Sequence, residues 1–353
     1  MPLKLGVIGC GVIGRKHVAA AMGDPAIDVV ALADLEEDAA RTLADEHGIG
    51  KVYASAEAIL ADPEVQAVVL ALVTGVRGAV ALDSLRAGKH VLLEKPPAMD
   101  VQELQRIADA AGDRVVASCS SRLTFNRVAE TAREVVAGGE LGPIRTIHVR
   151  CVQPVGPARP EHTPPPWRAK RSLNGGGYLV NWGVYDVDFM LYVLGDRFAP
   201  SDVLAQSWPV APHLAEGRVD PASDAENHFV ALLRGTEGQT FLLERGEFTS
   251  LPKSMAWQIS GDQASLSLAM VADQAPPTLV LHRADPENGL VSDTVLDEYG
   301  SDVQHDMPVR DFAAAIAEGR PPRTDLHRAM RIQRIIDAID QSIENASHAT
   351  SRR

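Results

Sequence analysis

Three glycines in the spacing G-x-G-x-x-G constrain the fold of this 353-residue chain more than any other feature. They follow the apolar run Leu3 to Ile8 and open a segment of helical periodicity from Val12 to Met22. In a strand-turn-helix unit, such glycines allow a tight turn, close approach of the backbone to a diphosphate, and close packing of the helix on the strand. The free amides and the dipole at the helix N-terminus favour the negative charge. The sequence therefore predicts a dinucleotide-binding turn made of Gly9, Gly11, Val12, Ile13 and Gly14.

An acidic residue after the second apolar run indicates which dinucleotide binds. Asp34 ends the run Val29 to Ala33, about 20 positions beyond the glycine turn, where a carboxylate accepts hydrogen bonds from the ribose hydroxyls of NAD. The following residues, Leu35 to Asp38, include no Arg or Lys that could hold the 2′-phosphate of NADP. The sequence therefore favours NAD, with NADP as the weaker alternative. Asp34 could also cap the next helix, and the glycines alone could form a tight turn in another α/β protein.

The spacing of the apolar runs predicts a Rossmann domain, a doubly wound α/β fold with a parallel sheet, over residues 1–121. Short runs rich in Val, Leu and Ala alternate with longer segments of helical period, as is typical of parallel strands buried on both faces and joined by right-handed crossovers. One helix begins after Asp100, with Glu103 three residues on, and another ends at Gly88. The predicted strands are Leu3 to Ile8, Val29 to Ala33, Ala67 to Val73, Val91 to Leu93 and Val115 to Ala117.

A different pattern over residues 122–353 predicts an α+β domain with a mostly antiparallel, open sheet. Its apolar residues alternate with polar ones between Gly, Asp and Asn turns, as expected for strands with one covered face. A long final helix is expected over about residues 325–345, and it could pack on either domain. The predicted strands are Thr146 to Val152, Phe229 to Leu233, Thr240 to Leu243 and Ala256 to Ser260.

Six prolines fall in the fifteen residues from Gln153 to Trp167, so this stretch is predicted to be a loop. Loops of this length in compact domains are often functional. A lid over a substrate cleft and an arm or connection at an oligomer contact are both compatible with the sequence.

The composition is that of an ordinary globular chain and excludes several classes of partner. The formal net charge is -13 and no block of Lys and Arg is present, so nucleic acid is not expected to bind. Three scattered cysteines and histidines without zinc-binding spacing give no indication of a metal. No run of about 18 apolar residues and no signal-peptide pattern is present, so we expect a cytoplasmic protein without membrane association.

A lysine at the end of a later strand is the first candidate for catalysis. Val91 to Leu93 runs into Glu94, Lys95 and Pro96, at the sheet edge where doubly wound folds bind ligands. Pro96 stops the strand and stiffens the backbone around the lysine. The Lys95 ammonium could donate a hydrogen bond to a substrate oxygen, although these residues alone would equally describe an exposed lysine.

Three motifs together give the chain a resemblance to a known family over essentially its whole length. They are the glycine turn, the segment Ala87 to Val91 that leads to Glu94-Lys95-Pro96, and the run Gly175 to Gly177 with the helix after it. The chain resembles the glucose-fructose oxidoreductase, inositol dehydrogenase and rhizopine-catabolism group, usually written Gfo/Idh/MocA. The resemblance implies a nicotinamide-dependent oxidoreductase whose catalytic lysine is Lys95.

The resemblance also maps an acid/base pair of the family onto Asn181 and Tyr185. Spacing adds Asp188, because these three residues lie at i, i+4 and i+7 and would share one face of a regular helix. We expect Tyr185 to exchange the substrate proton, with Asn181 and Asp188 orienting the reacting groups. Tyr185 could instead be a half-buried packing residue. The neighbouring stripe is apolar and is expected to face a core; it comprises Val180, Val184, Val187 and Leu191.

This pair departs from the usual pattern of the family. Many relatives have a carboxylate where Asn181 stands and a histidine where Tyr185 stands. A phenol has an ordinary pKa of about 10, so a neutral tyrosine is a better acid than base. The ammonium of Lys95, if close, would lower the pKa of Tyr185 and allow proton transfer in either direction. This departure changes the detail of the proton transfer. It leaves the class of reaction unchanged, since some relatives have tyrosine here.

A second departure affects the nicotinamide end of the site. Relatives commonly read Thr-Pro-Asn where this chain has Thr74, Gly75 and Val76. The contact of that Asn cannot be carried over, which leaves a main-chain contact at Thr74. The resemblance adds Glu94 and Lys95 to the residues expected around the cofactor.

Candidates for substrate binding lie beside the glycine run. Trp167 could stack on a sugar ring, and Arg168 could bind hydroxyls, a carboxylate or the cofactor diphosphate. A solvated basic turn is the alternative interpretation of the segment Trp167 to Arg171. Arg122, where the second domain begins, is a weaker candidate of the same kind.

These features predict an NAD-dependent dehydrogenase or reductase acting on a secondary alcohol or ketone of a sugar, glycoside or cyclitol. A glycosidase or epimerase that oxidises its sugar transiently is one alternative, and a sensing protein that binds NAD and sugar without catalysis is another. Antiparallel sheets with an open face often pair between subunits, so a homodimer or homotetramer is expected.

Overall fold

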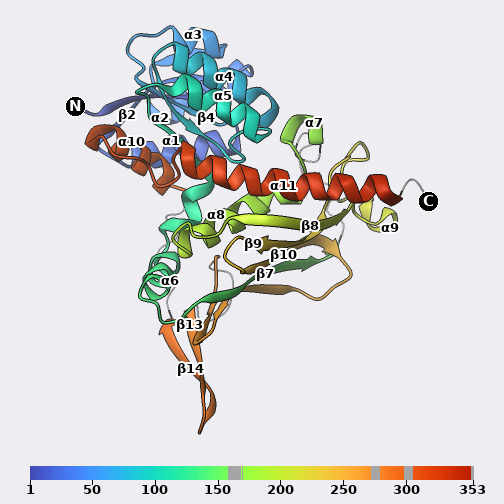
Figure 1. Ribbon diagram of the computed structural model, residues 1–353. Helices are drawn as coiled ribbons and strands as arrows, with labels where there is room; N and C mark the ends of the chain where they lie inside the picture. The colour runs from blue at the N-terminus through green and yellow to red at the C-terminus, as the bar shows by residue number, and fades with distance from the viewer. Residues whose placement is uncertain (158–167, 169, 272–278, 298–304, 351–353) are drawn as a thin grey trace. The chain divides into compact units, whose positions relative to one another are not determined.

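A computed structural model describes residues 1–157, 168, 170–271, 279–297 and 305–350, with only the backbone at residues 347–350. The chain divides into two compact units. Unit 1 comprises Met1–Arg122, Leu173–Gly175 and Val303–Gln333, and unit 2 comprises Leu123–Ser172, Gly176–Asp302 and Arg334–Arg353. Each unit has one sheet (Figure 1).

The sheet of unit 1 is parallel and has six strands in the order β3-β2-β1-β4-β5-β6. The strand order reverses between β1 and β4, and a doubly wound sheet binds its ligand at such a point. The predicted Rossmann fold is therefore confirmed. The strands are β1 Leu3–Ile8, β2 Ile27–Ala33, β3 Lys51–Tyr53, β4 Ala67–Leu70, β5 His90–Leu93 and β6 Val116–Ser118.

Helices cover both faces of this sheet. One core combines strand residues with helices α1, α2 and α10, and the other combines them with α3, α4 and α5. Figure 1 shows α4 and α5 side by side. The helices are α1 Val12–Met22, α2 Glu37–His47, α3 Ala56–Leu60, α4 Thr74–Arg86, α5 Val101–Ala111 and α10 Met307–Glu318.

Two helix ends agree with the sequence prediction, and one strand was missed. The Asp100 carboxylate accepts a hydrogen bond from the Glu103 amide at 2.7 Å, which caps α5 as expected. Gly88 follows α4 with a φ of +73°. Strand β3 has three half-buried residues, Lys-Val-Tyr, and lacks the apolar run on which strand prediction depends.

The sheet of unit 2 has eight strands in the order β14-β13-β12-β11-β7-β10-β9-β8, and of its neighbouring pairs only β7 and β10 are parallel. The predicted, mostly antiparallel sheet is confirmed, and the four predicted strands are β7, β9, β10 and β11. The strands are β7 Ile144–Pro154, β8 Pro200–Trp208, β9 His228–Gly235, β10 Thr240–Thr249, β11 Ser254–Gly261, β12 Ala264–Leu268, β13 Leu279–Asp285 and β14 Gly289–Leu296.

Strands β8, β12, β13 and β14 were not predicted. In β14 nearly every side chain is exposed or half-buried, so the alternation that marks a strand with one covered face is absent. In β12 the polar positions are serines and the strand is short. Pairing with a neighbouring strand, which is a tertiary interaction, stabilises such segments.

Helix α8 packs on the buried face of this sheet, where the Trp257 indole donates a hydrogen bond to Asp186 at 2.9 Å. The opposite face exposes leucines on three adjacent strands, Leu204, Leu232 and Leu242, which pair directly across β8, β9 and β10. The other helical elements are a 3-10 helix Cys119–Phe125, α6 Arg127–Ala137, α7 Arg171–Asn174, a π-helix Leu179–Gly183, α8 Val184–Val193, α9 Pro212–Ala215 and α11 Leu326–Thr350.

The final helix is longer than predicted. α11 extends to Thr350, whereas the apolar pattern ends near Asn345. Residues 326–333 of this helix belong to unit 1 and the rest to unit 2. Among the helices that the structure describes, none is long and apolar enough to cross a membrane.

Candidate active site

The glycine turn joins β1 to α1, and its first and third glycines are required by the backbone. Gly9 has a φ of +98°, and a Cβ atom there would lie 2.5 Å from the carbonyl oxygen of Ala71. A Cβ atom on Gly14 would lie 1.8 Å from the carbonyl oxygen of Gly9. A larger residue at either position would force β1, α1 and the β4 end apart.

Gly11 is different, because a Cβ atom there would meet no atom within 4 Å. Gly11 is the N-cap of α1, no side chain caps this helix, and its first turn has no acidic residue. Val12 is 76 % exposed and Ile13 is half-buried. The open space beside Gly11 and the free amides of this helix N-terminus suit a diphosphate group.

Asp34 is fixed against this turn by two backbone amides. Its Oδ2 accepts a hydrogen bond from the Cys10 amide at 2.6 Å, and its Oδ1 accepts one from the Glu36 amide at 2.9 Å. Helix α2 begins at Glu37 with Glu36 as N-cap, so the alternative in which Asp34 caps the helix is wrong. Each carboxylate oxygen keeps a second lone pair that can accept a ribose hydroxyl.

Lys95 follows β5 and is half-buried. The buried guanidinium of Arg77 holds the backbone on both sides of it. Arg77 donates to the carbonyl oxygen of Glu94 at 2.8 Å and also to those of Pro96 and Leu72. Burial lowers the pKa of Arg77 to about 10. One side chain thus joins the ends of β4 and β5. The sequence did not reveal this role, although the residues just before Arg77 depart from the usual pattern of the family.

The Glu94 side chain supports the same segment from within. Its Oε1 lies 2.9 Å from His17 Nε2, and its Oε2 accepts a hydrogen bond from the Lys95 amide at 2.9 Å. Burial would raise the pKa of Glu94, but the hydrogen bond with His17 and the charges of Lys95 and Arg77 lower it to about 2. Glu94 is therefore a carboxylate at neutral pH and orients the lysine backbone.

The thiol of Cys119 completes a compact group with these two side chains. Its Sγ lies 3.8 Å from His17 Nε2, and donor atoms of His17, Glu94 and Cys119 all lie within 4.8 Å of one another. Burial raises the pKa of Cys119 well above its ordinary value, which favours the thiol over the metal-binding thiolate. We interpret the group as a hydrogen-bonded support for Glu94.

Two further predicted residues of unit 1 contact side chains that the sequence did not connect to them. Thr74 is the first residue of α4, is 1 % exposed, and donates a hydrogen bond to Asn174 Oδ1 at 3.1 Å. Arg122 lies in the 3-10 helix, with its terminal nitrogen 3.0 Å from Nε2 of His305. Neither residue could have been paired from spacing, because the partners lie 100 and 183 positions away.

In unit 2 the glycine run leads into the helical segment of Asn181 and Tyr185. A Cβ atom on Gly177 would lie 2.0 Å from the carbonyl oxygen of Glu226, so glycine is required at this close approach. The carboxylate of Glu226 accepts hydrogen bonds from the amides of Gly177 and Leu179 at 3.0 Å. Glu226 thus binds the free amides at the start of the π-helix.

The expected regular helix with three polar residues on one face is not what forms. Asn181 lies in the π-helix Leu179–Gly183, whereas Tyr185 and Asp188 lie in α8. A π-turn bonds each residue to the fifth along, so a spacing of four no longer completes a turn. Tyr185 is 2 % exposed and Asp188 is fully buried, so Tyr185 is more deeply buried than the half-buried packing residue considered from the sequence.

A buried ion pair anchors α8 to the sheet. Asp186, which is fully buried, accepts hydrogen bonds from Arg245 on β10, one of them at 2.9 Å, and from the Trp257 indole. The Arg245 guanidinium also lies 5.0 Å from the ring centroid of Trp182, whose ring lies 5.7 Å from that of Tyr185. The position of Tyr185 therefore depends on Asp186 and Arg245, which the sequence analysis did not select.

Arg168 and Asn181 line one pocket of unit 2, which we name the Glu247 pocket. Arg168 is exposed and Asn181 is half-buried. Neighbouring Arg171 forms an ion pair with Asp340, one contact being 2.6 Å, so the alternative of a purely solvated basic turn is wrong for this residue. Trp167 lies outside the described residues, as do residues 158–166 of the proline-rich stretch. The polar side chains of the pocket are Arg168, Tyr178, Asn181, Asp220, Glu226, Asn227 and Glu247.

The sequence matches two domains of one family. Residues 3–119 match the family described as an oxidoreductase family with an NAD-binding Rossmann fold, and residues 129–267 match the GFO/IDH/MocA C-terminal domain. The chain belongs to the Gfo/Idh/MocA family. The resemblance drawn from the three motifs is therefore confirmed, and residues 3–119 form the NAD-binding Rossmann fold of this oxidoreductase.

Individual relatives are similar to this Gfo/Idh/MocA chain over most of their length. The 1,5-anhydro-D-fructose reductase of Ensifer adhaerens is 29 % identical over 82 % of this chain and 83 % of that protein. The D-glucoside 3-dehydrogenase of Escherichia coli K12 is 26 % identical, covering 98 % of this chain and 97 % of that protein. The crystal structure of an oxidoreductase domain protein from Kribbella flavida has a TM-score of 0.80 at 25 % identity, over 100 % and 98 % of the two chains.

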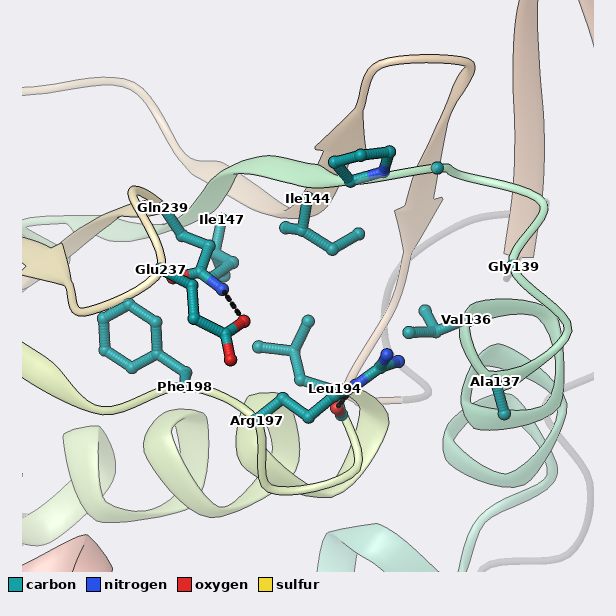
Figure 2. Close-up of a pocket in the computed structure, with 12 residues that line it drawn as sticks. Val136, Ala137, Gly139, Ile144, Ile147, Leu194, Arg197, Phe198, Glu237 and Gln239 are labelled. Carbon is teal, nitrogen blue, oxygen red and sulfur yellow. Dashed lines mark hydrogen bonds between the residues drawn. The ribbon is translucent and has the colours of Figure 1, made fainter.

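A larger cavity of this Gfo/Idh/MocA chain, about 180 Å³ in volume, also lies in unit 2, away from the predicted residues. Figure 2 shows its apolar wall, which includes Ile144, Ile147 and Leu194, and the hydrogen bond of 3.0 Å between Gln239 and Glu237. None of the sequence-predicted site residues is among its described lining. By volume alone, this cavity would be the candidate functional site. The polar side chains of the Glu247 pocket make that pocket the better candidate.

Proposed function

We propose that this chain is an NAD-dependent oxidoreductase that transfers hydride between nicotinamide and a secondary alcohol or ketone of a sugar, glycoside or cyclitol. The observation that carries the proposal is the glycine turn, where Gly11 faces open space beside the bare N-terminus of α1. The relatives support the substrate class, since their names describe a sugar reductase and a glucoside dehydrogenase.

The proposed roles follow from the chemistry of each side chain. When bound, the nicotinamide supplies or accepts the hydride. Lys95 donates a hydrogen bond to the reacting oxygen and polarises it, and Tyr185 exchanges the proton of that oxygen. Asn181 and Asp188 orient these groups. Thr74, Glu94 and Lys95 contact the nicotinamide end of the cofactor, while Arg122, Trp167 and Arg168 bind the substrate.

The preference for NAD rests on Asp34. Its carboxylate would accept the ribose hydroxyls, and it would repel the 2′-phosphate of NADP, for which Leu35 to Asp38 offer no cation. We propose that residues 1–121 bind the cofactor and residues 122–353 the substrate.

The activity is tested by following NADH absorbance with a panel of sugars, glycosides and inositols. We expect Lys95→Met to lower kcat by about 100-fold to 10,000-fold, the usual contribution of a positioned proton or hydrogen-bond donor. Glu140→Gln, which removes an exposed partner of Arg283, is the matched control and should keep full activity. Equal turnover by wild type and Lys95→Met would contradict the assignment.

We also propose a cytoplasmic homo-oligomer formed through the exposed face of the unit 2 sheet. The apolar row Leu204, Leu232 and Leu242 lies on that face, and a second copy would cover it. The three cysteines are buried and form no disulfide with one another, which suits a reducing compartment. Leu232→Glu should convert a dimer or tetramer to a smaller species in light scattering, and a wild-type monomer would contradict the proposal.

A further inference from the structure

We propose that the Glu247 pocket is a subsite for a neutral hydroxyl or hydroxymethyl group of the substrate, and that Glu247 is the residue that recognises it. The inference rests on the proposed function, because it concerns the sugar or cyclitol on which the enzyme acts. All the described residues that line the pocket belong to unit 2.

Two carboxylates of the pocket, the buried Glu226 and the half-buried Glu247, have different surroundings. Glu226 accepts hydrogen bonds from two backbone amides and, at 3.4 Å, from the guanidinium of Arg171, so its binding capacity is used within the protein. Glu247 accepts one hydrogen bond, from the Asn227 side chain to Oε1 at 3.1 Å, and no described residue donates to its Oε2. A carboxylate has about four lone-pair sites, so Glu247 can accept hydrogen bonds from a ligand.

The surroundings of Glu247 favour a ligand that donates to it. Burial raises the pKa of Glu247, while the hydrogen bond from Asn227 and the charge of Arg168 oppose the shift. A half-buried acceptor with a free lone pair gains a hydrogen bond when a ligand donates to it. A hydroxyl group can donate to Glu247 and accept from a neighbouring amide or guanidinium, whereas a carboxylate or a fully ionised phosphate can only accept.

The size of the pocket decides which part of a substrate enters. Its volume is about 30 Å³, which leaves room for a small polar group and is too little for a whole sugar ring. The described lining is more negative than positive: it has three carboxylates, of Asp220, Glu226 and Glu247, and one guanidinium, of Arg168. One neutral hydroxyl or hydroxymethyl group fits both the volume and the charge.

The decisive experiment compares wild type, Glu247→Gln and the control Glu140→Gln. The probes are methyl β-D-glucoside, myo-inositol, the monodeoxy forms of each, and D-glucuronate. Turnover gives kcat and KM, and saturation-transfer NMR gives binding without turnover. For the parent compound, we expect Glu247→Gln to raise KM about tenfold or more with kcat within about threefold, as for loss of a hydrogen bond to a charged group.

One monodeoxy form should be insensitive to the substitution, because it lacks the hydroxyl that Glu247 binds. A merely structural role would raise KM equally for all monodeoxy forms, and that result, or an unchanged KM, would overturn the subsite. If no probe is turned over but NMR shows binding that depends on Glu247, the subsite stands and the proposed oxidoreductase activity fails. Absence of binding of every probe to the wild type would overturn the subsite.

Discussion

The cofactor turn of unit 1 and the Glu247 pocket of unit 2 are built in different ways. The turn is made by backbone within a few consecutive residues, where Gly9 and Gly14 are required by contacts of main-chain atoms. The pocket is made by side chains from distant segments, such as Arg168, Asn227 and Glu247. A site of the first kind depends on local conformation, whereas one of the second kind depends on which strands pair.

The largest expected effect is the loss of stability when a buried side-chain pair of unit 2 is broken. Asp186→Asn leaves the buried charge of Arg245 without its partner, so we expect the free energy of unfolding to fall by about 3 to 5 kcal/mol. Urea unfolding measures this loss. The exposed pair of Glu140 and Arg283 provides the control, since Glu140→Gln should cost at most about 1 kcal/mol. Equal costs for the two variants would show that unit 2 does not depend on the buried pair.

A second prediction concerns a part of unit 1 that is held by a side chain, since the Glu94 carboxylate supports the backbone of Lys95. The pKa of Glu94 in the folded protein is about 2, below its ordinary 4.5, so ionised Glu94 stabilises the fold fully above its unfolded pKa. This stability is lost as the pH falls through the folded value. We expect wild type to exceed Glu94→Gln by about 3 kcal/mol at neutral pH.

The same difference should shrink progressively as the pH is lowered from about 5 towards 2, as measured by urea unfolding of both proteins. A difference that stays constant over this range would mean that the Glu94 charge does not contribute. In that case the hydrogen bonds of Arg77, and not the charge of Glu94, would hold the backbone around Lys95.

The smallest expected effect is the difference in stability between alanine variants of two glycines in the same turn. Gly14→Ala places a Cβ atom against the carbonyl oxygen of Gly9 and should lower the free energy of unfolding by about 1 to 3 kcal/mol. Gly11→Ala meets no atom, so stability should stay within about 1 kcal/mol of wild type. NAD binding, measured by calorimetry, should weaken in both. Strong destabilisation by Gly11→Ala would contradict the open space beside it.

Correspondingly, much of unit 1 could be predicted and much less of unit 2. The parallel strands and the start of α5 at Asp100 follow from apolar runs and short-range capping. In unit 2, β8 and β14 were missed because their exposed residues hide the alternating pattern. The π-helix at Asn181 was not predicted either, because the spacing of its residues is equally compatible with an α-helix.

The residues alone were enough to predict the glycine turn, the acidic end of β2, the position of Lys95 after β5 and the family. Local spacing encodes these features, since a turn and its helix involve neighbouring residues. The folded structure was needed to show that Arg77 holds the backbone around Lys95, that Arg245 pairs with Asp186, and that Glu247 lines a pocket with Arg168. Such contacts depend on strand order and burial, which bring residues together irrespective of their separation along the chain.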